Sequence, residues 1–204
     1  MSGPQPFVAD LQELHRRARE HMEEGALEDA DRGVTALKLL NDALAISVVR
    51  VQRYTSHYLS VKGPHREAVK QEFGPHARQE QEHALRLAER LRQLGGWPDF
   101  KPEGLRSLDP SPPFDVQDRW DWIREELEAE ELTLQIYREL LLYFADRDPV
   151  TRQLLEDLLS NEEAHARDLE ARLRDSRPRP GSAPSDPAPD PTGSNAGRPR
   201  RPSA

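Results

Sequence analysis

Two short motifs in this sequence place a carboxylate and an imidazole three residues apart, at Glu80-x-x-His83 and at Glu162-x-x-His165. On a helix, residues three apart project from the same face, so the two side chains of each motif can reach one ion. Of the seven histidines in the chain, only these two have a glutamate three positions earlier. Carboxylate oxygen and imidazole nitrogen together suit iron or manganese, with zinc also acceptable. The spacing therefore predicts metal binding.

A third glutamate, Glu130, joins these motifs in the predicted interior. On three of the predicted helices apolar residues recur at spacings of three and four, as on a buried helix face, and polar residues interrupt them near the middle. A buried carboxylate without a partner is costly, whereas a divalent cation compensates several at once. A metal is therefore favoured over the alternative of exposed salt bridges. The three stripes are Val69, Phe73, His76, Glu80, His83 and Leu87; Ile123, Leu127, Glu130, Leu134, Tyr137 and Leu141; and Leu155, Leu158, Glu162, His165, Leu169 and Leu173.

Some polar and aromatic residues near these positions have a simpler interpretation. His76 lies one turn before Glu80, and we expect it to be a core or rim histidine and not a ligand. Tyr54, Tyr58 and Tyr137 are expected in the core, where Tyr54 is also within reach of a ligand carboxylate.

The sequence predicts one short helix and four long ones. Gly95-Gly96 and Pro98 supply a strong stop signal for the second long helix, while Gly74-Pro75 is expected to kink or break it. Short loops on either side of a long connection, 95–117, indicate two antiparallel helix pairs joined by a crossover. The predicted helices span about residues 7–22, 31–60, 65–94, 118–145 and 150–174.

Composition divides the chain into an N-terminal extension (1–30), a helical domain (31–175) and a tail (176–204). Apolar residues make up 35% of the sequence and charged residues 32%, which suits one helical domain. Eight of the 18 prolines fall in the tail, among Ser, Gly, Asp and Arg. Such a composition buries too little apolar surface to order itself, so the tail is expected to be disordered.

Charge and cysteine content exclude several functions. The net charge is −8, and the tail carries five Arg against two Asp, which leaves the body near −11. An acidic body repels phosphate backbones, so we expect it to bind no nucleic acid. Without cysteine there are no disulfides, thiolate zinc sites or iron–sulfur clusters. No run of about 18 apolar residues occurs, so we expect a cytoplasmic protein with no membrane partner.

These features resemble the ferritin-like superfamily, and within it the bacterioferritin-like group. The resemblance covers about residues 37–173 and implies an all-α, ferritin-like four-helix bundle with a di-metal site. In that site one Glu comes from each of two helices and Glu-x-x-His from each of the others. By this likeness Glu80 and Glu162 would bridge two metals at the catalytic centre. The ligand set would be completed by His83, His165 and Glu130. The stretches that carry the resemblance are Leu39-Leu40-Asn41-Asp42-Ala43-Leu44-Ala45, Glu80-Gln81-Glu82-His83-Ala84, Leu94-Gly95-Gly96 and Glu162-Glu163-Ala164-His165.

The sequence departs from the family pattern on the first long helix. The remaining terminal carboxylate belongs there, and the register that turns Leu40, Leu44, Val51, Tyr54 and Tyr58 inward puts Ser47 at its position. The metal nearest His83 is therefore expected to be weakly held. Arg50, one turn later, either reaches the carboxylates in place of a cation or points away from them. The haem-ligating Met of bacterioferritins is replaced by Gln81, so no haem is expected.

The leading hypothesis is an iron-binding protein that oxidises Fe(II) with oxygen or peroxide at this site. Ser47 and Arg50 motivate an alternative, a non-catalytic ferritin-like subunit or interaction module that binds one metal or none. A peroxidase or dimanganese catalase-like enzyme on the same fold stays open as a third interpretation. The expected partners are metal ions and copies of the same chain in a homo-oligomer. The helix pattern leaves the subunit number and the partner of the tail open.

Overall fold

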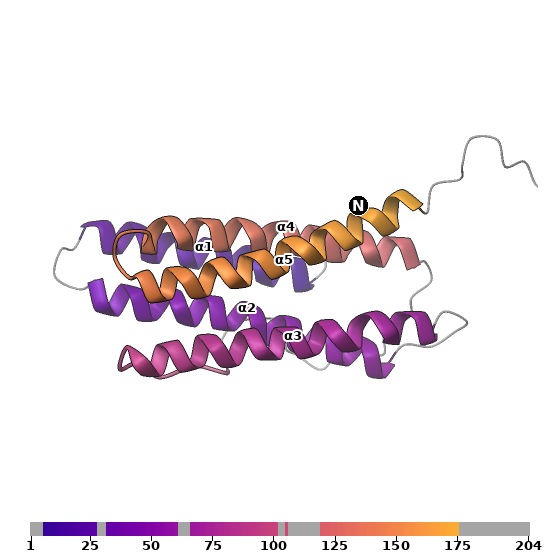
Figure 1. Cartoon of the computed structure of the whole chain (residues 1–204), viewed down its shortest axis with the longest axis horizontal. Helices are drawn as coiled ribbons and strands as arrows, with labels where there is room; N and C mark the ends of the chain where they lie inside the picture. The colour runs from indigo at the N-terminus through magenta and orange to yellow at the C-terminus, as the bar shows by residue number, and fades with distance from the viewer. Residues whose placement is uncertain (1–5, 28–31, 61–65, 102–104, 106–118, 176–204) are drawn as a thin grey trace, which may run out of the picture.

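The structure, a computed structural model, describes residues 6–27, 32–60, 66–101, 105 and 119–175. These residues form five α-helices and contain no strand (Figure 1). The predicted all-α fold is confirmed, and the helix ends differ from the predicted ones by one residue, or by up to five in the first helix. The helices are α1 (Pro6–Leu27), α2 (Arg32–Ser60), α3 (Arg66–Gln93), α4 (Arg119–Phe144) and α5 (Pro149–Asp175).

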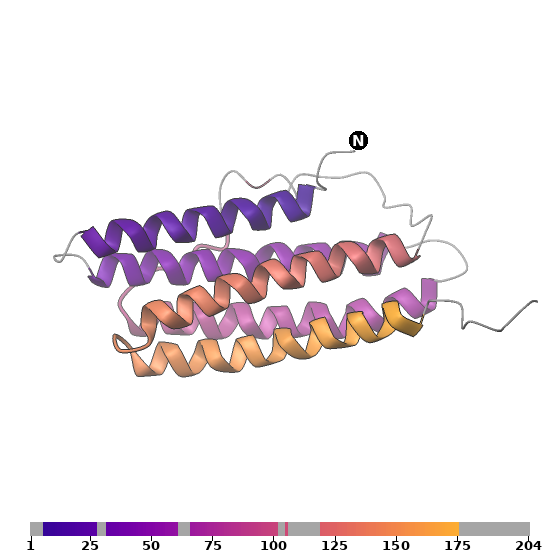
Figure 2. The same ribbon diagram turned by 90° about the horizontal axis from the view of Figure 1, so that it is seen from above.

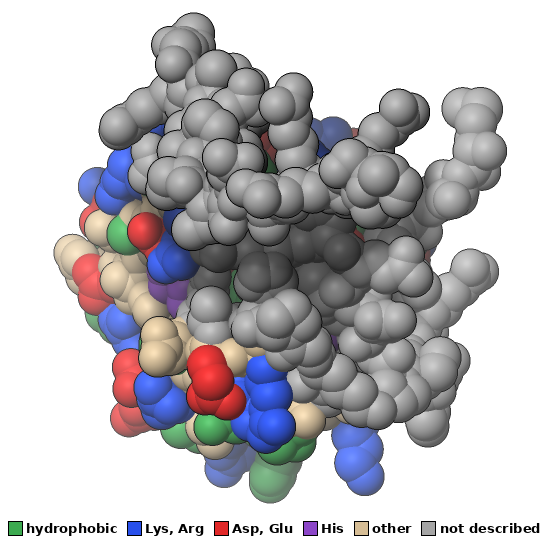
Figure 3. All heavy atoms as spheres, turned by 90° about the vertical axis from the view of Figure 1, so that its right-hand side faces the viewer, with side chains coloured by type: hydrophobic (Ala, Val, Ile, Leu, Met, Phe, Trp, Pro, Cys, Tyr) green, Lys and Arg blue, Asp and Glu red, His purple; other side chains and the backbone are tan. Residues whose placement is uncertain are grey.

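The four long helices form two pairs, α2 with α3 and α4 with α5. Helices α3 and α4 run in the same direction along the bundle, so the chain between them connects opposite ends (Figure 1). This arrangement is the predicted pair of antiparallel hairpins with one crossover. At the end of the bundle seen in Figure 3, acidic and basic side chains lie next to each other on the described part of the surface.

Helix α1 packs along the outside of α2 and α4 (Figure 2). Its apolar face, Phe7, Leu11, Leu14 and Ala18, is fully buried in the main core. Burying a leucine or phenylalanine side chain stabilises a fold by roughly 1.5–3 kcal/mol. Helix α1 is therefore an integral layer of the domain.

Two ionic clusters also hold α1 in place. Asp42 of α2, which is buried, accepts hydrogen bonds from Arg17 Nε and His21 Nδ1, both at 2.7 Å. Glu139 of α4 is bonded to His15 Nε2 at 2.9 Å and to Arg19. The hydrogen bond from Arg19, together with His15 and against the effect of burial, lowers the pKa of Glu139 to about 2. Helix α2 and helix α4 thus each supply one carboxylate that binds side chains of α1.

Local sequence explains where α3 ends and α5 begins. Gly95 adopts a φ of 82°, which favours glycine, and the amides of Gly95 and Gly96 bond the carbonyls of Arg92 and Leu91 at 3.1 and 2.9 Å. The predicted C-terminal stop is confirmed. At the start of α5, Asp148 Oδ1 accepts the amides of Val150 and Thr151, both at 3.1 Å. This is an N-cap directly before a proline at the first helical position.

Two details differ from the expectations. Of the kink or break expected at Gly74-Pro75, the break does not occur, because α3 continues through Pro75. Pro75 has no amide hydrogen to donate to the carbonyl of Gln71. Both residues lie on the exposed side of the helix, where water can donate to that carbonyl instead. Tyr58 is not a core residue: it is 38% exposed, near the end of α2, with Lys70 over its ring.

The predicted disordered tail, 176–204, lies outside the described residues. Within them, no helix is long and apolar enough to cross a membrane.

Candidate metal centre

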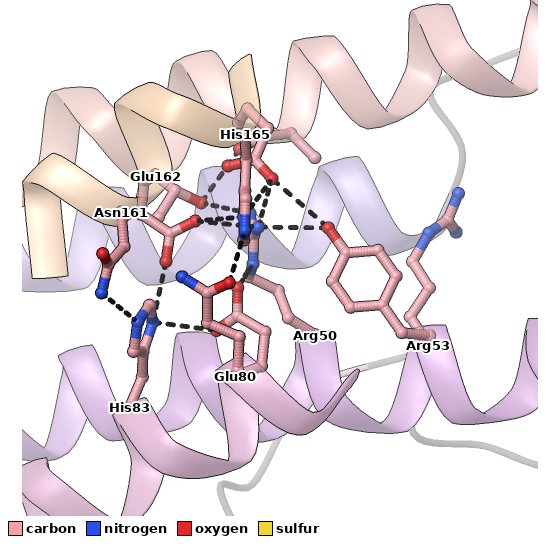
Figure 4. Close-up of polar contacts among 12 residues, drawn as sticks. Arg50, Arg53, Glu80, His83, Asn161, Glu162 and His165 are labelled. Atoms are coloured by element: carbon pink, nitrogen blue, oxygen red, sulfur yellow. Dashed lines mark hydrogen bonds and ion pairs between the residues drawn. The ribbon is translucent and has the colours of Figure 1, made fainter. Parts of the chain in front are cut away.

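The structure brings all five sequence-predicted ligands together in the middle of the bundle (Figure 4). Helix α3 supplies Glu80 and His83, α4 supplies Glu130, and α5 supplies Glu162 and His165. None of them is more than 8% exposed. They form two groups that share Glu162, and in each group one ligand atom per residue lies within 4.8 Å of the others. We call Glu80, His83 and Glu162 the His83 group, and Glu130, Glu162 and His165 the His165 group.

The His83 group has three buried ligand atoms that face one another without hydrogen bonds. His83 Nδ1 lies 2.9 Å from Glu162 Oε1 and 3.7 Å from Glu80 Oε2. Although the 2.9 Å contact is close, its direction is not that of a hydrogen bond, and all three atoms lack a hydrogen-bond partner. Ligands about 2.1 Å from one ion are separated by roughly 3–3.5 Å, so these atoms fit around a single metal. An unpaired buried polar atom otherwise costs about 1–3 kcal/mol.

The His165 group differs because an arginine from α2 already contacts it. His165 Nδ1 lies 3.8 Å from Glu130 Oε1 and 3.5 Å from Glu162 Oε2. The Arg50 Nη2 donates a hydrogen bond to each of these two oxygens, at 3.1 Å in the case of Glu162. Of the atoms that face the group, only Glu130 Oε2 and His165 Nδ1 lack a partner. The guanidinium therefore occupies the place between these carboxylates that a cation would take.

Arg50 is held in this position on every side. Its side chain is completely buried, and its Nε donates to Glu80 Oε1. Nη1 donates to the hydroxyl of Thr133 and Nη2 to the hydroxyl of Tyr54, both at 3.1 Å. Of the two orientations considered from the sequence, the inward one is the orientation present. A buried guanidinium needs compensating carboxylates, and here it has three.

Burial and neighbouring charges move the pKa values of the site in opposite directions. Burial raises the pKa of Glu130 well above its ordinary range, in spite of the adjacent Arg50. Burial acts on Glu162 in the same way, but Arg50, His165 and His83 together lower its pKa well below the usual value. For His83, burial lowers the pKa and the adjacent carboxylates of Glu162 and Glu80 raise it, with a net result of about 9. Of these two glutamates, Glu162 is thus the one held in its charged form.

Each histidine is oriented by an amide side chain from the opposite helix. His165 Nε2 donates to Gln79 Oε1 at 2.8 Å, which leaves Nδ1 directed at the carboxylates. His83 Nε2 lies 3.2 Å from the amide nitrogen of Asn161. If the amide nitrogen and oxygen of Asn161 exchange places, the oxygen accepts a hydrogen bond from Nε2–H. The neutral imidazole then carries its proton on Nε2, and the lone pair of Nδ1 can bind a metal. Gln79 and Asn161 each directly precede the glutamate of a Glu-x-x-His motif, and this shared position is a sequence signal that could have identified them.

Other residues near the centre were only partly anticipated. His76 stacks on His165 with ring centroids 4.3 Å apart and belongs to neither ligand group, as expected from the sequence. Burial lowers its pKa to about 4. A second arginine, the half-buried Arg53, binds Glu126 at 2.6 Å and points away from the centre (Figure 4). Glu126 lies one turn before Glu130 and on the same face, so its helical spacing could have identified it.

Ser47 lies in the core of α2, one turn before Arg50, and is completely buried. Burial raises the pKa of the nearby Tyr137 hydroxyl, and neither this hydroxyl nor that of Ser47 has a hydrogen-bond partner. The register that turns Leu40, Leu44, Ser47 and Tyr54 inward is confirmed by their burial. Val51, placed in the same register, is instead half-buried and lines an apolar surface groove between α2 and α3.

Comparison with known proteins points to one family. Residues 37–177 match the family model described as a ferritin-like domain. A bacterioferritin of Desulfovibrio desulfuricans is 25% identical over 136 residues, which cover 66% of this chain and 72% of that protein. The matched region begins within α2, so α1 lies outside it.

Solved structures agree with this match. The dodecameric thioferritin of Bacteroides fragilis has a TM-score of 0.60 and 27% identity, covering 70% of this chain and 86% of that chain. The structure of the Desulfovibrio desulfuricans bacterioferritin, which has a diiron site, also has a TM-score of 0.60, with 24% identity over 71% of this chain and 81% of that chain. The second likeness shows the fold alone.

Proposed function

The chain belongs to the ferritin-like family, and on that premise we propose that it binds iron at the centre formed by α2–α5 and oxidises Fe(II) there. The observation that carries the proposal is the convergence of buried ligand atoms without partners in the His83 group. Two carboxylate oxygens and one imidazole nitrogen are a donor set that suits iron. Fe(II) is the substrate, and it would lose an electron to oxygen or peroxide when bound.

The residues of this chain would bind the ion and control its surroundings. Glu80 and Glu162 supply the negative charge that favours the higher oxidation state of iron. Asn161 and Gln79 orient the imidazoles, and the complete burial of both carboxylates excludes bulk water. Manganese or zinc is accepted by the same donor set, and manganese would open the catalase-like chemistry considered above.

Assembly and further ligands are proposed from the relatives. Because the Bacteroides fragilis relative is dodecameric, we expect this chain to form a homo-oligomer, which a measurement of mass in solution would test. A bacterioferritin of Rhodobacter capsulatus contains haem iron. The absence of haem from this protein stays a prediction, based on Gln81.

Iron loading tests the proposal directly. The full chain is loaded anaerobically with Fe(II), desalted and assayed for iron, and the ultraviolet absorbance of ferric iron is followed after oxygen is admitted. Retained iron and a rise in absorbance above that of free Fe(II) in buffer are expected. Iron that does not survive desalting, or that is oxidised no faster than in buffer, would contradict the proposal.

The buried guanidinium favours a second candidate function, a non-catalytic ferritin-like subunit. With Arg50 among three carboxylates, the interior is compensated in part without any metal. Such a protein would retain its fold and its assembly in the presence of a chelator and would bind no iron. Complete absence of iron after anaerobic loading, in a folded chain, would favour this function over oxidation.

Replacing Ser47 with glutamate tests whether this position limits the site. The added carboxylate is expected to increase iron affinity and the oxidation rate, because it supplies a further hard oxygen ligand. It is also expected to destabilise the metal-free protein by roughly 1–3 kcal/mol, since Ser47 is fully buried. Ser47→Ala is the control and should change either quantity little. If iron content and oxidation rate in Ser47→Glu equal those of the wild type, the idea that Ser47 limits the site is wrong.

A further inference from the structure

We infer that Arg50 acts as a built-in cation in the His165 group, so that the centre binds one divalent metal ion, in the His83 group, instead of two. This inference rests on the proposed function, since it specifies how many ions the same site binds and where. It also reverses the expectation from the sequence that the ion nearest His83 would be the weaker one.

The guanidinium of Arg50 lies against the oxygens that a metal in the His165 group would need. A metal in the His165 group would need Glu130 Oε1 and Glu162 Oε2, which are the oxygens nearest His165 Nδ1. Both of these oxygens accept hydrogen bonds from Arg50 Nη2. A cation that binds the same oxygens would meet the positive guanidinium at contact distance, in a region that water does not reach.

The ligand atoms of the His83 group, in contrast, make no hydrogen bond with Arg50. Arg50 donates hydrogen bonds to Glu80 Oε1 and to Glu162 Oε2. The other oxygen of each carboxylate, together with His83 Nδ1, forms the His83 group and has no hydrogen bond. Each of these glutamates therefore turns one oxygen toward the arginine and one toward the place for a metal.

The charge balance of the centre also favours a single ion. Three buried carboxylates, one guanidinium and one divalent ion add up to no net charge when all three glutamates are ionised and both histidines are neutral. A second divalent ion would leave two positive charges in excess inside the bundle. Isolated charge in the interior is strongly unfavourable, so a single ion is the occupancy that this set of residues compensates.

Arg50 is also held firmly in its place. Its side chain is fully buried, and Tyr54 and Thr133 bind its two terminal nitrogens in addition to the carboxylates. Moving it to solvent would break five hydrogen bonds, two of them to neutral hydroxyls that also lie inside the bundle. An incoming metal therefore does not displace it easily.

A pair of matched histidine variants tests the inference with Mn(II) as the probe. Full-length wild type, His83→Ala and His165→Ala are loaded with Mn(II), and bound metal is measured by elemental analysis and by electron paramagnetic resonance. The wild type is expected to bind about one Mn(II) per chain, with the spectrum of an isolated ion. His83→Ala should weaken binding on the order of 100-fold, whereas His165→Ala should weaken it much less.

Arg50→Met is the third variant, and it should raise the occupancy toward a second, spin-coupled Mn(II). The histidine pair decides the question even if this variant does not fold. Two coupled ions in the wild type, or equal losses in His83→Ala and His165→Ala, would overturn the inference and leave the proposed iron binding intact. If neither Mn(II) nor Fe(II) binds to the wild type, the proposed function and the inference both fail.

Discussion

Replacement of Arg50 with methionine is expected to lower the free energy of unfolding of the metal-free protein by about 3–5 kcal/mol, as is usual when one partner of a buried ion pair is removed. Methionine keeps most of the apolar volume of the arginine stem but removes the charge and all five hydrogen bonds. Glu80, Glu130 and Glu162 would then be buried together without a cation. Urea unfolding followed by circular dichroism, with a chelator present, measures the loss.

A surface arginine provides the control for this variant. Arg16 also pairs with two carboxylates, Glu13 and Glu20, but its side chain is 55% exposed. Arg16→Met should therefore cost far less, because ion pairs on the surface contribute little to stability. Added Mn(II) should restore stability to Arg50→Met, because a ligand that binds only the folded state stabilises it. A loss for Arg50→Met as small as that for Arg16→Met would show that the buried charge is not needed for the fold.

Replacement of Glu162 with glutamine is expected to abolish metal binding. Glu162 is the only residue that belongs to both ligand groups, so its loss removes a ligand from whichever group binds the ion. An amide oxygen carries no charge and is a poor substitute for a carboxylate that the adjacent Arg50 and histidines hold in its charged form. Retained Fe(II) or Mn(II) after desalting is expected to fall from about one ion per chain to near none.

The neighbouring residue Glu163 is the matched control for Glu162→Gln. Glu163 lies on the same helix, but its side chain is 37% exposed and binds Arg138 at 2.9 Å on the surface. Glu163→Gln should keep the metal content of the wild type. Circular dichroism of both variants would check that the helices are intact. Metal retained by a folded Glu162→Gln protein would exclude the centre described above as the binding site.

Helix pattern was sufficient to predict much of this molecule. The spacing of three between Glu80 and His83, and between Glu162 and His165, places both pairs on the buried face of a helix, and the structure brings them together with Glu130. The reason is that helical periodicity is a local property of the chain, and apolar neighbours at the same spacing determine which face is buried. The stop at Gly95 is local in the same sense, because left-handed backbone favours glycine.

The sequence pattern was not sufficient where the outcome depended on what surrounds a residue in the folded protein. Pro75 does not break α3, since its surroundings leave the affected carbonyl open to solvent. The bonds from Gln79 to His165 and from Asn161 to His83 cross between α3 and α5. No spacing within a single helix reveals which side chain of another helix will lie opposite.

Sequence by itself determined the helical bundle, the five candidate ligands and the departure at Ser47. Only the tertiary structure decided that Arg50 points into the centre, and that it contacts the oxygens facing His165 while leaving those facing His83 free. A long, flexible side chain can turn from a helix either to solvent or to the interior. Its direction depends on the total charge of the carboxylates that other helices bring to the same place, and that charge exists only after the helices have packed.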